Sequence, residues 1–248
     1  MPNRSARTLV TFLLDRTGSM EAIRDDTIGG FNTYLDTLKG DGSANIEFTL
    51  VQFDSMSIDK ICVAEPVAQV AKLTRDTYQP RASTPLIDAA YKTIEAVEAS
   101  LSTHPAERIV ICIQTDGHEN ASTEHNWNEL NALVKDKAAK GWQFNFMGVG
   151  IDAYDQGARM GIPAAATVAY DHRDPAATRA VFAASAENAR DYAVGARPTS
   201  VYCEKQKRSA GDRFADLFKS KPTSESADQK AEARKRALKK AIVDDITL

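Results

Sequence analysis

Residues 8–19, TLVTFLLDRTGS, are the stretch of sequence that decides the fold. Residues 8–14 are almost continuously apolar and rich in strand-forming residues, as expected of a central parallel strand that is buried on both faces. The pattern ends at Asp15 in a polar turn, and apolar residues then recur at three- and four-residue spacing from Met20 to Leu38, which predicts a helix. A buried strand that passes through a polar turn into a helix is the opening unit of an α/β fold.

The same alternation of strand and helix patterns continues along the chain. Further strands are predicted at residues 45–53, 60–63, 108–114, 142–149 and 167–170, with a loop over 64–83. Further helices are predicted at residues 85–101, 124–140, 153–160 and 176–192. This order predicts an α/β fold with a doubly wound, Rossmann-like, mostly parallel central sheet flanked by helices.

Beyond residue 195 the composition changes. Residues 196–248 hold 13 Lys and Arg against 8 Asp and Glu, a net charge of +5, whereas residues 1–195 carry a net charge of −8. We therefore divide the chain into an α/β domain, 1–195, and a basic C-terminal extension, 196–248, with a helix expected at 231–243. The extension is expected to be an arm or partly disordered, and an arm that wraps a neighbour would allow oligomerisation.

Composition narrows the function classes. The hydrophobic content of 43% and charged content of 26% are ordinary for a globular protein, and an acidic body argues against a nucleic-acid-binding core. Cys62, Cys112 and Cys203 are far apart and odd in number, which argues against a disulfide framework or a zinc site and favours a reducing compartment. The short apolar run before Asp15 has the form of neither a signal peptide nor a membrane span, so we expect a cytoplasmic protein without membrane contact.

Three polar segments lie where ligands gather in parallel sheets. Asp15-Arg-Thr-Gly-Ser19 follows the first strand, Ser83-Thr84 precedes a helix, and Thr115-Asp116-Gly117 follows the strand at 108–114. Ligand sites of open α/β sheets form beyond the carboxyl ends of the strands, so the three segments are expected to converge there.

The side chains of these segments point to a hard divalent cation. Asp15, Thr17, Ser19, Thr84 and Asp116 offer only oxygen, from two carboxylates and three hydroxyls, and this donor set suits Mg²⁺, with Mn²⁺ or Ca²⁺ as alternatives. Pro85 suits a first helical turn, so Thr84 is expected to be the helix N-cap as well as a ligand. An ordinary polar turn capped by Ser19 would explain the first segment, but neither Thr84 nor Asp116.

The three segments together resemble the metal-ion-dependent adhesion site of von Willebrand factor A domains. D-R-T-G-S resembles the D-x-S-x-S element of that family, S-T-P-L its second-loop threonine, and T-D-G its third-loop aspartate. The resemblance covers roughly residues 8–195 and is closest to standalone A-domain proteins of bacteria and their phages. A phage-encoded protein would be associated with the virion. The sequence departs from the family at Thr17, which replaces a serine, and at residues 81–83, which replace a glycine-rich lead-in and bear on loop mobility.

The resemblance implies a function as well as a site. In the family the five matching residues hold one cation, which keeps a coordination position for an acidic side chain of a partner protein. The chain is therefore expected to be a non-enzymatic, metal-dependent protein-binding module. His118 and Glu119 are either rim residues that contact the partner or ordinary exposed loop residues, and Asp54 is a candidate for supporting the ligands from behind.

Two other functions remain open from the sequence. Asp15-Arg-Thr-Gly-Ser19 also resembles the D-K-T-G-T of haloacid-dehalogenase-like phosphotransferases, in which Asp15 would be the nucleophile. Against this, residue 17 is a threonine where small phosphatases carry a second acid, and a helix pattern follows Ser19 at once. The third possibility is a structural or assembly component, for example of a phage particle, that docks through the α/β domain and uses the extension as an arm.

Overall fold

The structure, a computed structural model, describes residues 6–40, 42, 44–150 and 152–218. The helix expected at 231–243, and with it most of the predicted arm, lies outside these residues. The strands are β1 (Thr8–Asp15), β2 (Ile46–Phe53), β3 (Ile58–Pro66), β4 (Arg108–Gln114), β5 (Gln143–Val149) and β6 (Thr167–Tyr170). The α-helices are α1 (Arg24–Lys39), α2 (Leu86–Ser100), α3 (Trp127–Ala139), α4 (Asp152–Met160), α5 (Pro175–Ala193) and α6 (Glu204–Ser209). Short 3₁₀ helices are η1 (Gly18–Ile23), η2 (Val67–Gln69), η3 (Ala164–Ala166) and η4 (Ala215–Phe218).

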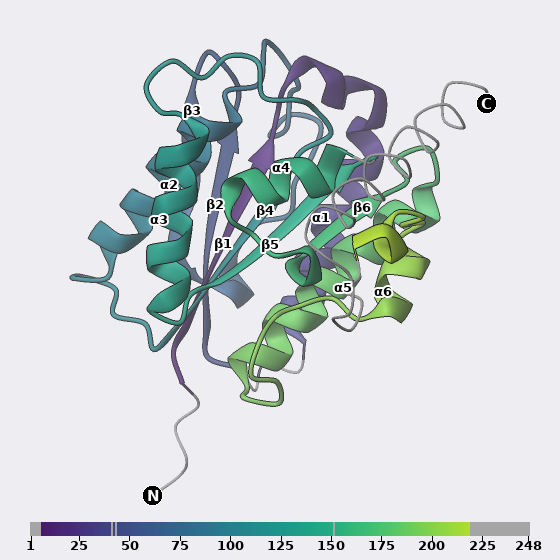
Figure 1. The fold of residues 1–248 in the computed structure, drawn as a ribbon. Helices are drawn as coiled ribbons and strands as arrows, with labels where there is room; N and C mark the ends of the chain where they lie inside the picture. The colour runs from purple at the N-terminus through teal and green to yellow at the C-terminus, as the bar shows by residue number, and fades with distance from the viewer. Residues whose placement is uncertain (1–5, 41, 43, 151, 219–248) are drawn as a thin grey trace, which may run out of the picture.

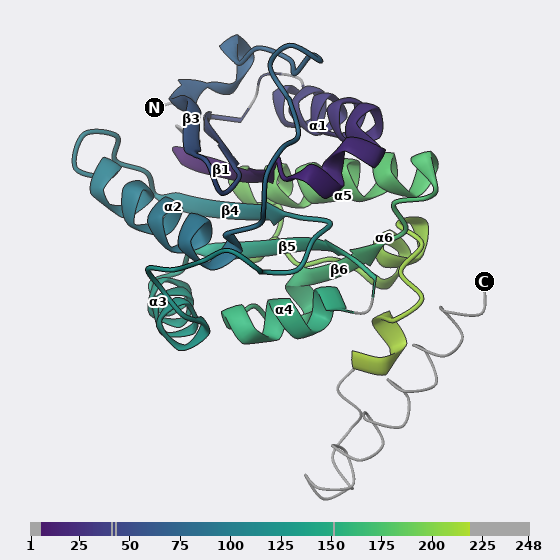
Figure 2. The same ribbon diagram turned by 90° about the horizontal axis from the view of Figure 1, so that it is seen from above.

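The strands form one six-stranded sheet in the order β3-β2-β1-β4-β5-β6 (Figure 1). All neighbouring pairs are parallel except β2 and β3, which form an antiparallel hairpin. Viewed from above, α1 and α5 lie over one face and α2, α3 and α4 over the other (Figure 2). This is the predicted doubly wound architecture, and the strand order reverses between β1 and β4. Loops at the carboxyl ends of those two strands therefore diverge and leave room for a ligand.

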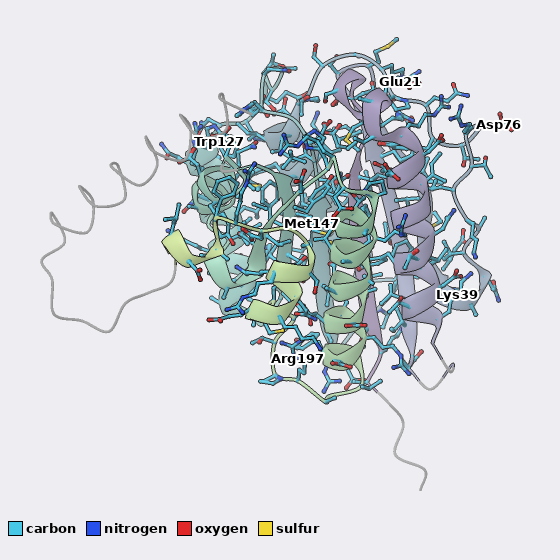
Figure 3. All side chains as sticks on the ribbon, turned by 90° about the vertical axis from the view of Figure 1, so that its right-hand side faces the viewer. Glu21, Lys39, Asp76, Trp127, Met147 and Arg197 are labelled. Carbon is cyan, nitrogen blue, oxygen red and sulfur yellow. The ribbon has the colours of Figure 1, made fainter. Side chains whose placement is uncertain are left out.

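The two faces of the sheet are covered by separate apolar cores. On the α1 and α5 side, the Phe12 ring lies 5.5 Å from the Phe31 ring and stacks on Phe182 at 5.9 Å. A Cβ added to Gly30 would lie 2.5 Å from the Phe182 ring, so this glycine permits the close approach of α1 to α5. In Figure 3, α1 runs from the Glu21 end of the molecule to Lys39, and α5 lies beside it and ends near Arg197.

Three elements differ from the prediction by more than one residue at an end. Residues 18–23 wind as the 3₁₀ helix η1, so α1 begins at Arg24 rather than near Met20. The strand predicted at 60–63 runs from Ile58 to Pro66 and takes the start of the expected loop. α3 begins at Trp127 rather than Glu124, because the amides just before it bond to acidic side chains and Asn126 caps the helix.

The described start of the predicted extension packs onto the α/β body. Lys207 Nζ donates to Tyr154 Oη at 3.0 Å, and that hydroxyl donates to Asp212 Oδ2 at 2.6 Å. All three residues are buried, and Asp212 also accepts the amide of Ala169 in β6. The packed body therefore continues past residue 195, through α6. No helix in the described part of the chain is both long and apolar enough to cross a membrane.

Candidate functional site

The predicted site lies beyond the carboxyl ends of β1 and β4. These strands pair in parallel with Leu14 opposite Gln114, so Asp15 and the Thr115-Asp116-Gly117 turn leave the sheet side by side. η1 follows Asp15 within three residues and turns the chain back over this edge. The loop that ends at Thr84 reaches the same place from the other side, where Gly18 donates its amide to Ala82 at 3.0 Å.

Asp15 is completely buried and both of its carboxylate oxygens are bonded. Oδ1 accepts the amide of Thr17 at 2.6 Å, and Oδ2 accepts the hydroxyl of Thr115. The buried Tyr78 hydroxyl also donates to the Asp15 carbonyl at 2.6 Å. Burial raises the pKa of Asp15 to about 7, against the hydrogen bonds from Thr115 and Thr17, which lower it. A carboxylate is thus held in a position where its own charge is costly.

Ser19 connects the first loop to the third. Its hydroxyl donates to Asp116 Oδ1 at 2.6 Å and lies 3.3 Å from the Thr17 hydroxyl. Burial raises the pKa of Asp116 as well, although the Ser19 bond lowers it. The alternative in which Ser19 caps a helix is wrong: Thr17 holds the N-cap position of η1, and neither it nor Ser19 caps the helix with its side chain.

Gly117 brings Thr84 into the same cluster. A Cβ built on Gly117 would lie 3.2 Å from Thr84 Oγ1 and 3.5 Å from Ser19 Oγ, so the two hydroxyls face one small space. The predicted cap is not formed, because Pro85 occupies the N-cap position of α2. The structure thus brings the five predicted residues together at one edge of the sheet. They are Asp15, Thr17, Ser19, Thr84 and Asp116.

The sequence did not predict the hydrogen bonds that connect the second site loop, at Thr84, to the third, at residues 115–122. Glu119 accepts the amide of Ile87 at 2.8 Å and so caps α2, and its other oxygen accepts the amides of Ala121 and Ser122. Asn120 accepts the Thr84 amide at 2.8 Å. Glu119, expected to be either a rim residue or an ordinary exposed loop residue, is half-buried and connects the third loop to the start of α2. These hydrogen bonds join loops that are distant in sequence, so the sequence does not predict them. The only signal in the sequence was the acidic residue Glu119, which lies shortly after T-D-G.

His118 remains at the exposed rim of this edge. Its side chain is 71% exposed, and Nε2 lies 3.2 Å from Asp152 Oδ2 at the start of α4. α4 also approaches the third loop through Gln156, which donates to the Gly117 carbonyl at 3.4 Å. The rim beside Asp116 is therefore formed by the third loop together with the first turns of α4.

The donor set fits a hard divalent cation. All five side chains present oxygen, and burial opposes the charges of both carboxylates, so a cation placed among them would supply the missing counter-charge. Gly117 leaves the space in front of Ser19 and Thr84 open, which a Cβ would narrow. Within the part of the chain that the structure describes, no three His, Cys, Asp or Glu side chains gather into a metal-holding group. The five-residue set is not a group of that kind, because hydroxyls of Thr and Ser supply three of its five ligands.

Comparison with known proteins gives a likeness of fold. No family model matches the chain, and none of the curated proteins matches its sequence. Among solved structures it resembles the pilus adhesin SpaC from Lactobacillus rhamnosus GG in an open conformation. That match has a TM-score of 0.56 and 13% sequence identity, and it covers 77% of this chain and 31% of the SpaC chain.

Two other solved structures with lower scores are named as von Willebrand factor domains. One is the domain of the type V pili tip protein Mfa5 from Porphyromonas gingivalis, at TM-score 0.45 and 10% identity, covering 63% of this chain and 85% of that one. The other is the SpRpn10 VWA domain, at TM-score 0.40 and 9% identity, covering 58% and 76%. The likeness to SpaC is one of fold alone, and it agrees with the six-stranded, mostly parallel α/β sheet of this chain.

Proposed function

We propose that the chain is a metal-dependent protein-binding module. Asp15, Thr17, Ser19, Thr84 and Asp116 would hold one divalent cation, Mg²⁺ by ligand preference, with Mn²⁺ or Ca²⁺ as alternatives. The observation that carries the proposal is the convergence of five side-chain oxygens from three separate loops at the point where the strand order reverses. Pilus proteins occur among the similar structures, and their likeness agrees with a binding role.

The residues of the site would divide the work. The hydroxyls of Thr17, Ser19 and Thr84 offer neutral oxygen, whereas Asp15 and Asp116 offer charge that burial makes costly. The bound cation would supply positive charge at the rim and hold an acidic side chain of the partner protein. Such a contact, removed from water, stabilises a complex far more than an exposed salt bridge, which contributes about 0–1 kcal/mol.

A phosphotransferase with Asp15 as nucleophile is less well supported. A nucleophilic carboxylate must reach its substrate, but Asp15 is completely buried and both of its oxygens accept hydrogen bonds. η1 also starts three residues later and covers this edge. We expect no hydrolysis of a general phosphatase substrate with Mg²⁺ present, and Asp15-dependent turnover would reverse the choice between the two functions. An assembly role for the extension depends largely on residues outside the described part.

Calorimetry on chelator-treated protein tests the metal site directly. Titration with Mg²⁺, Mn²⁺ and Ca²⁺ is expected to show one site per chain in the wild type and none in Asp15→Ala. Asp25→Asn, which changes an exposed carboxylate on α1, is the matched control and is expected to bind as the wild type does. Capture of the same partner by wild type and Asp25→Asn, and its loss with Asp15→Ala or chelator, tests the binding role. Absence of cation uptake by the wild type would refute the proposal.

A further inference from the structure

Arg16 lies between two of the proposed ligands but sends its side chain into a buried ionic cluster. Its guanidinium bonds to Asp54 Oδ2, with Nε at 2.9 Å and one terminal nitrogen at 2.8 Å. The same terminal nitrogen contacts Asp59 Oδ2 at 2.8 Å and the Ser57 hydroxyl at 2.9 Å. The Arg16 side chain is only 10% exposed, so the first site loop is anchored to the turn between β2 and β3 by a buried charge.

Asp54 is shared by a second arginine from another loop. Arg81 Nε donates to Asp54 Oδ2 at 2.9 Å, while Asp54 Oδ1 accepts the amides of Met56 and Ser57. Burial opposes the charge of Asp54, but the bonds from Arg81 and the two amides, together with the charge of Arg16, hold its pKa below the usual value. One buried carboxylate thus holds together two guanidinium groups that would otherwise repel each other.

Backbone hydrogen bonds join the same loops. The amide of Arg81 donates to the carbonyl of Arg16 at 2.9 Å, and the amide of Gly18 donates to the carbonyl of Ala82 at 3.0 Å. Ser55, next to Asp54, donates its amide to the Ser83 carbonyl at 2.9 Å. The segment that presents Thr84 is therefore fixed to the segment that presents Thr17 and Ser19. Arg16 and Arg81, which form one of these backbone bonds, also share Asp54.

We propose that Arg16, Asp54 and Arg81 form an ionic clamp whose function is to position the first two site loops for cation binding. The clamp contributes no ligand. It sets the spacing between the Thr17–Ser19 hydroxyls and Thr84, because each loop carries one of the two arginines bound to Asp54. This inference rests on the proposed metal site and adds its positioning residues. It also predicts a site assembled before the cation arrives, since the clamp involves none of the five ligands.

The test is cation affinity measured beside thermal stability in three variants. Arg81→Met removes the outer arginine, and because this side chain is 45% exposed we expect the variant to fold. Asp54→Asn removes the shared charge, and Arg81→Lys keeps a charge without the two-pronged guanidinium contact. The control is Asp212→Asn. Asp212 is another buried carboxylate that accepts hydrogen bonds from two amides and a hydroxyl, and it lies beside β6, at the opposite edge of the sheet from β3.

We expect Arg81→Met and Asp54→Asn to bind Mg²⁺ and Mn²⁺ about tenfold more weakly than the wild type, as for other residues that orient metal ligands. Arg81→Lys should lie between Arg81→Met and the wild type, and Asp212→Asn should lose thermal stability while keeping wild-type affinity. Wild-type affinity in Arg81→Met overturns the clamp, whether or not Asp54→Asn folds. A wild type that takes up no cation refutes the metal site itself, which is a different result.

Discussion

Asp15 occupies a position that suits a carboxylate only when positive charge is near. The side chain is buried, its pKa is raised to about 7, and the guanidinium next to it in sequence is bound to Asp54 instead. At a pH between the usual pKa of an aspartate and about 7, Asp15 holds a proton in the folded protein that it has released in the unfolded chain. The stability of the cation-free protein therefore falls as pH rises through this range, and the full cost is present above pH 7.

Asp15→Asn is expected to separate stability from metal binding. At pH 8 without cation, the variant should be more stable than the wild type by about 1–3 kcal/mol, because it removes a buried charge without a counter-charge. The Thr17 amide can still donate to the Asn oxygen, and the Thr115 hydroxyl can accept from its amide. Denaturant unfolding at pH 5 and pH 8 measures the difference, which should shrink at pH 5. A variant less stable than the wild type at pH 8 would contradict this account.

Ala82 adopts a backbone conformation that favours glycine. Its φ of 61° lies in the left-handed region, and the residue is exposed, so little packing depends on its methyl group. Ala82→Gly is expected to raise the free energy of unfolding by about 0.5–1 kcal/mol. Ala158→Gly, at an exposed position inside α4, makes the same chemical change in a helix and should lower it by about 1 kcal/mol. If urea unfolding showed that both variants change the free energy of unfolding in the same direction, the backbone strain assigned to Ala82 would be refuted.

At the residue scale, the five candidate ligands were predictable because their chemistry is local. A carboxylate or hydroxyl at the end of a predicted strand can be read from the sequence. The three segments that carry them were expected to converge beyond the carboxyl ends of the strands. Their supports were not predictable, because Asn120 and Glu119 act on Thr84 and Ile87 across more than thirty residues. The predicted cap at Thr84 was wrong because Glu119 takes the amide that a capping hydroxyl would have bonded.

At the scale of elements, Asp88 determines where α3 begins. This buried carboxylate at the start of α2 accepts the amides of Thr123, Glu124 and His125. Those amides are thereby taken out of any helix, and α3 starts only at Trp127. Burial opposes ionisation of Asp88, but the three amide bonds prevail and hold its pKa below the usual value.

This arrangement predicts an acid-sensitive contribution to stability. Because the folded-state pKa of Asp88 is lowered, its contribution is complete above about pH 4 and is lost as pH falls through the lowered value. Asp88→Asn should cost about 2 kcal/mol at pH 7 and less at an acid pH below the lowered pKa, where the wild type loses the charge as well. Asp76→Asn, in an exposed loop, is the control. Equal destabilisation by Asp88→Asn at both pH values in denaturant unfolding would argue against the charge.

Element identities were predictable because strand and helix periodicities alternate clearly along residues 8–193. β4 and β6 have the predicted bounds, since short apolar runs with abrupt polar ends leave little choice. The extended β3 was predicted too short because its outer positions are exposed and its pairing with β2 is irregular. Alternation is weakest in such an edge strand, so its ends depend on the partner strand rather than on its own sequence.

At the scale of the whole molecule, the candidate site exists only when the sheet is assembled. Asp15 comes from β1, Asp116 follows β4, and Thr84 precedes α2, so their proximity depends on the reversal of strand order between β1 and β4. Cores on both faces of the sheet fix these strands. The unfolded chain has no equivalent arrangement of the five oxygens, and a cation that binds them stabilises the folded state alone.

Thermal unfolding of the full chain should therefore depend on cation concentration. With Mg²⁺ or Mn²⁺ at a hundred times its dissociation constant, linkage predicts about 2.7 kcal/mol of added stability, and a further tenfold increase should add about 1.4 kcal/mol. Asp15→Asn should start more stable than the wild type at pH 8 and show no response, so the two stability curves should approach or cross as cation is added. Calorimetric scans with chelator and at stepped cation concentrations measure this. Parallel curves for the two proteins would show that any stabilisation comes from general salt effects, because only a site that needs the Asp15 carboxylate makes them converge.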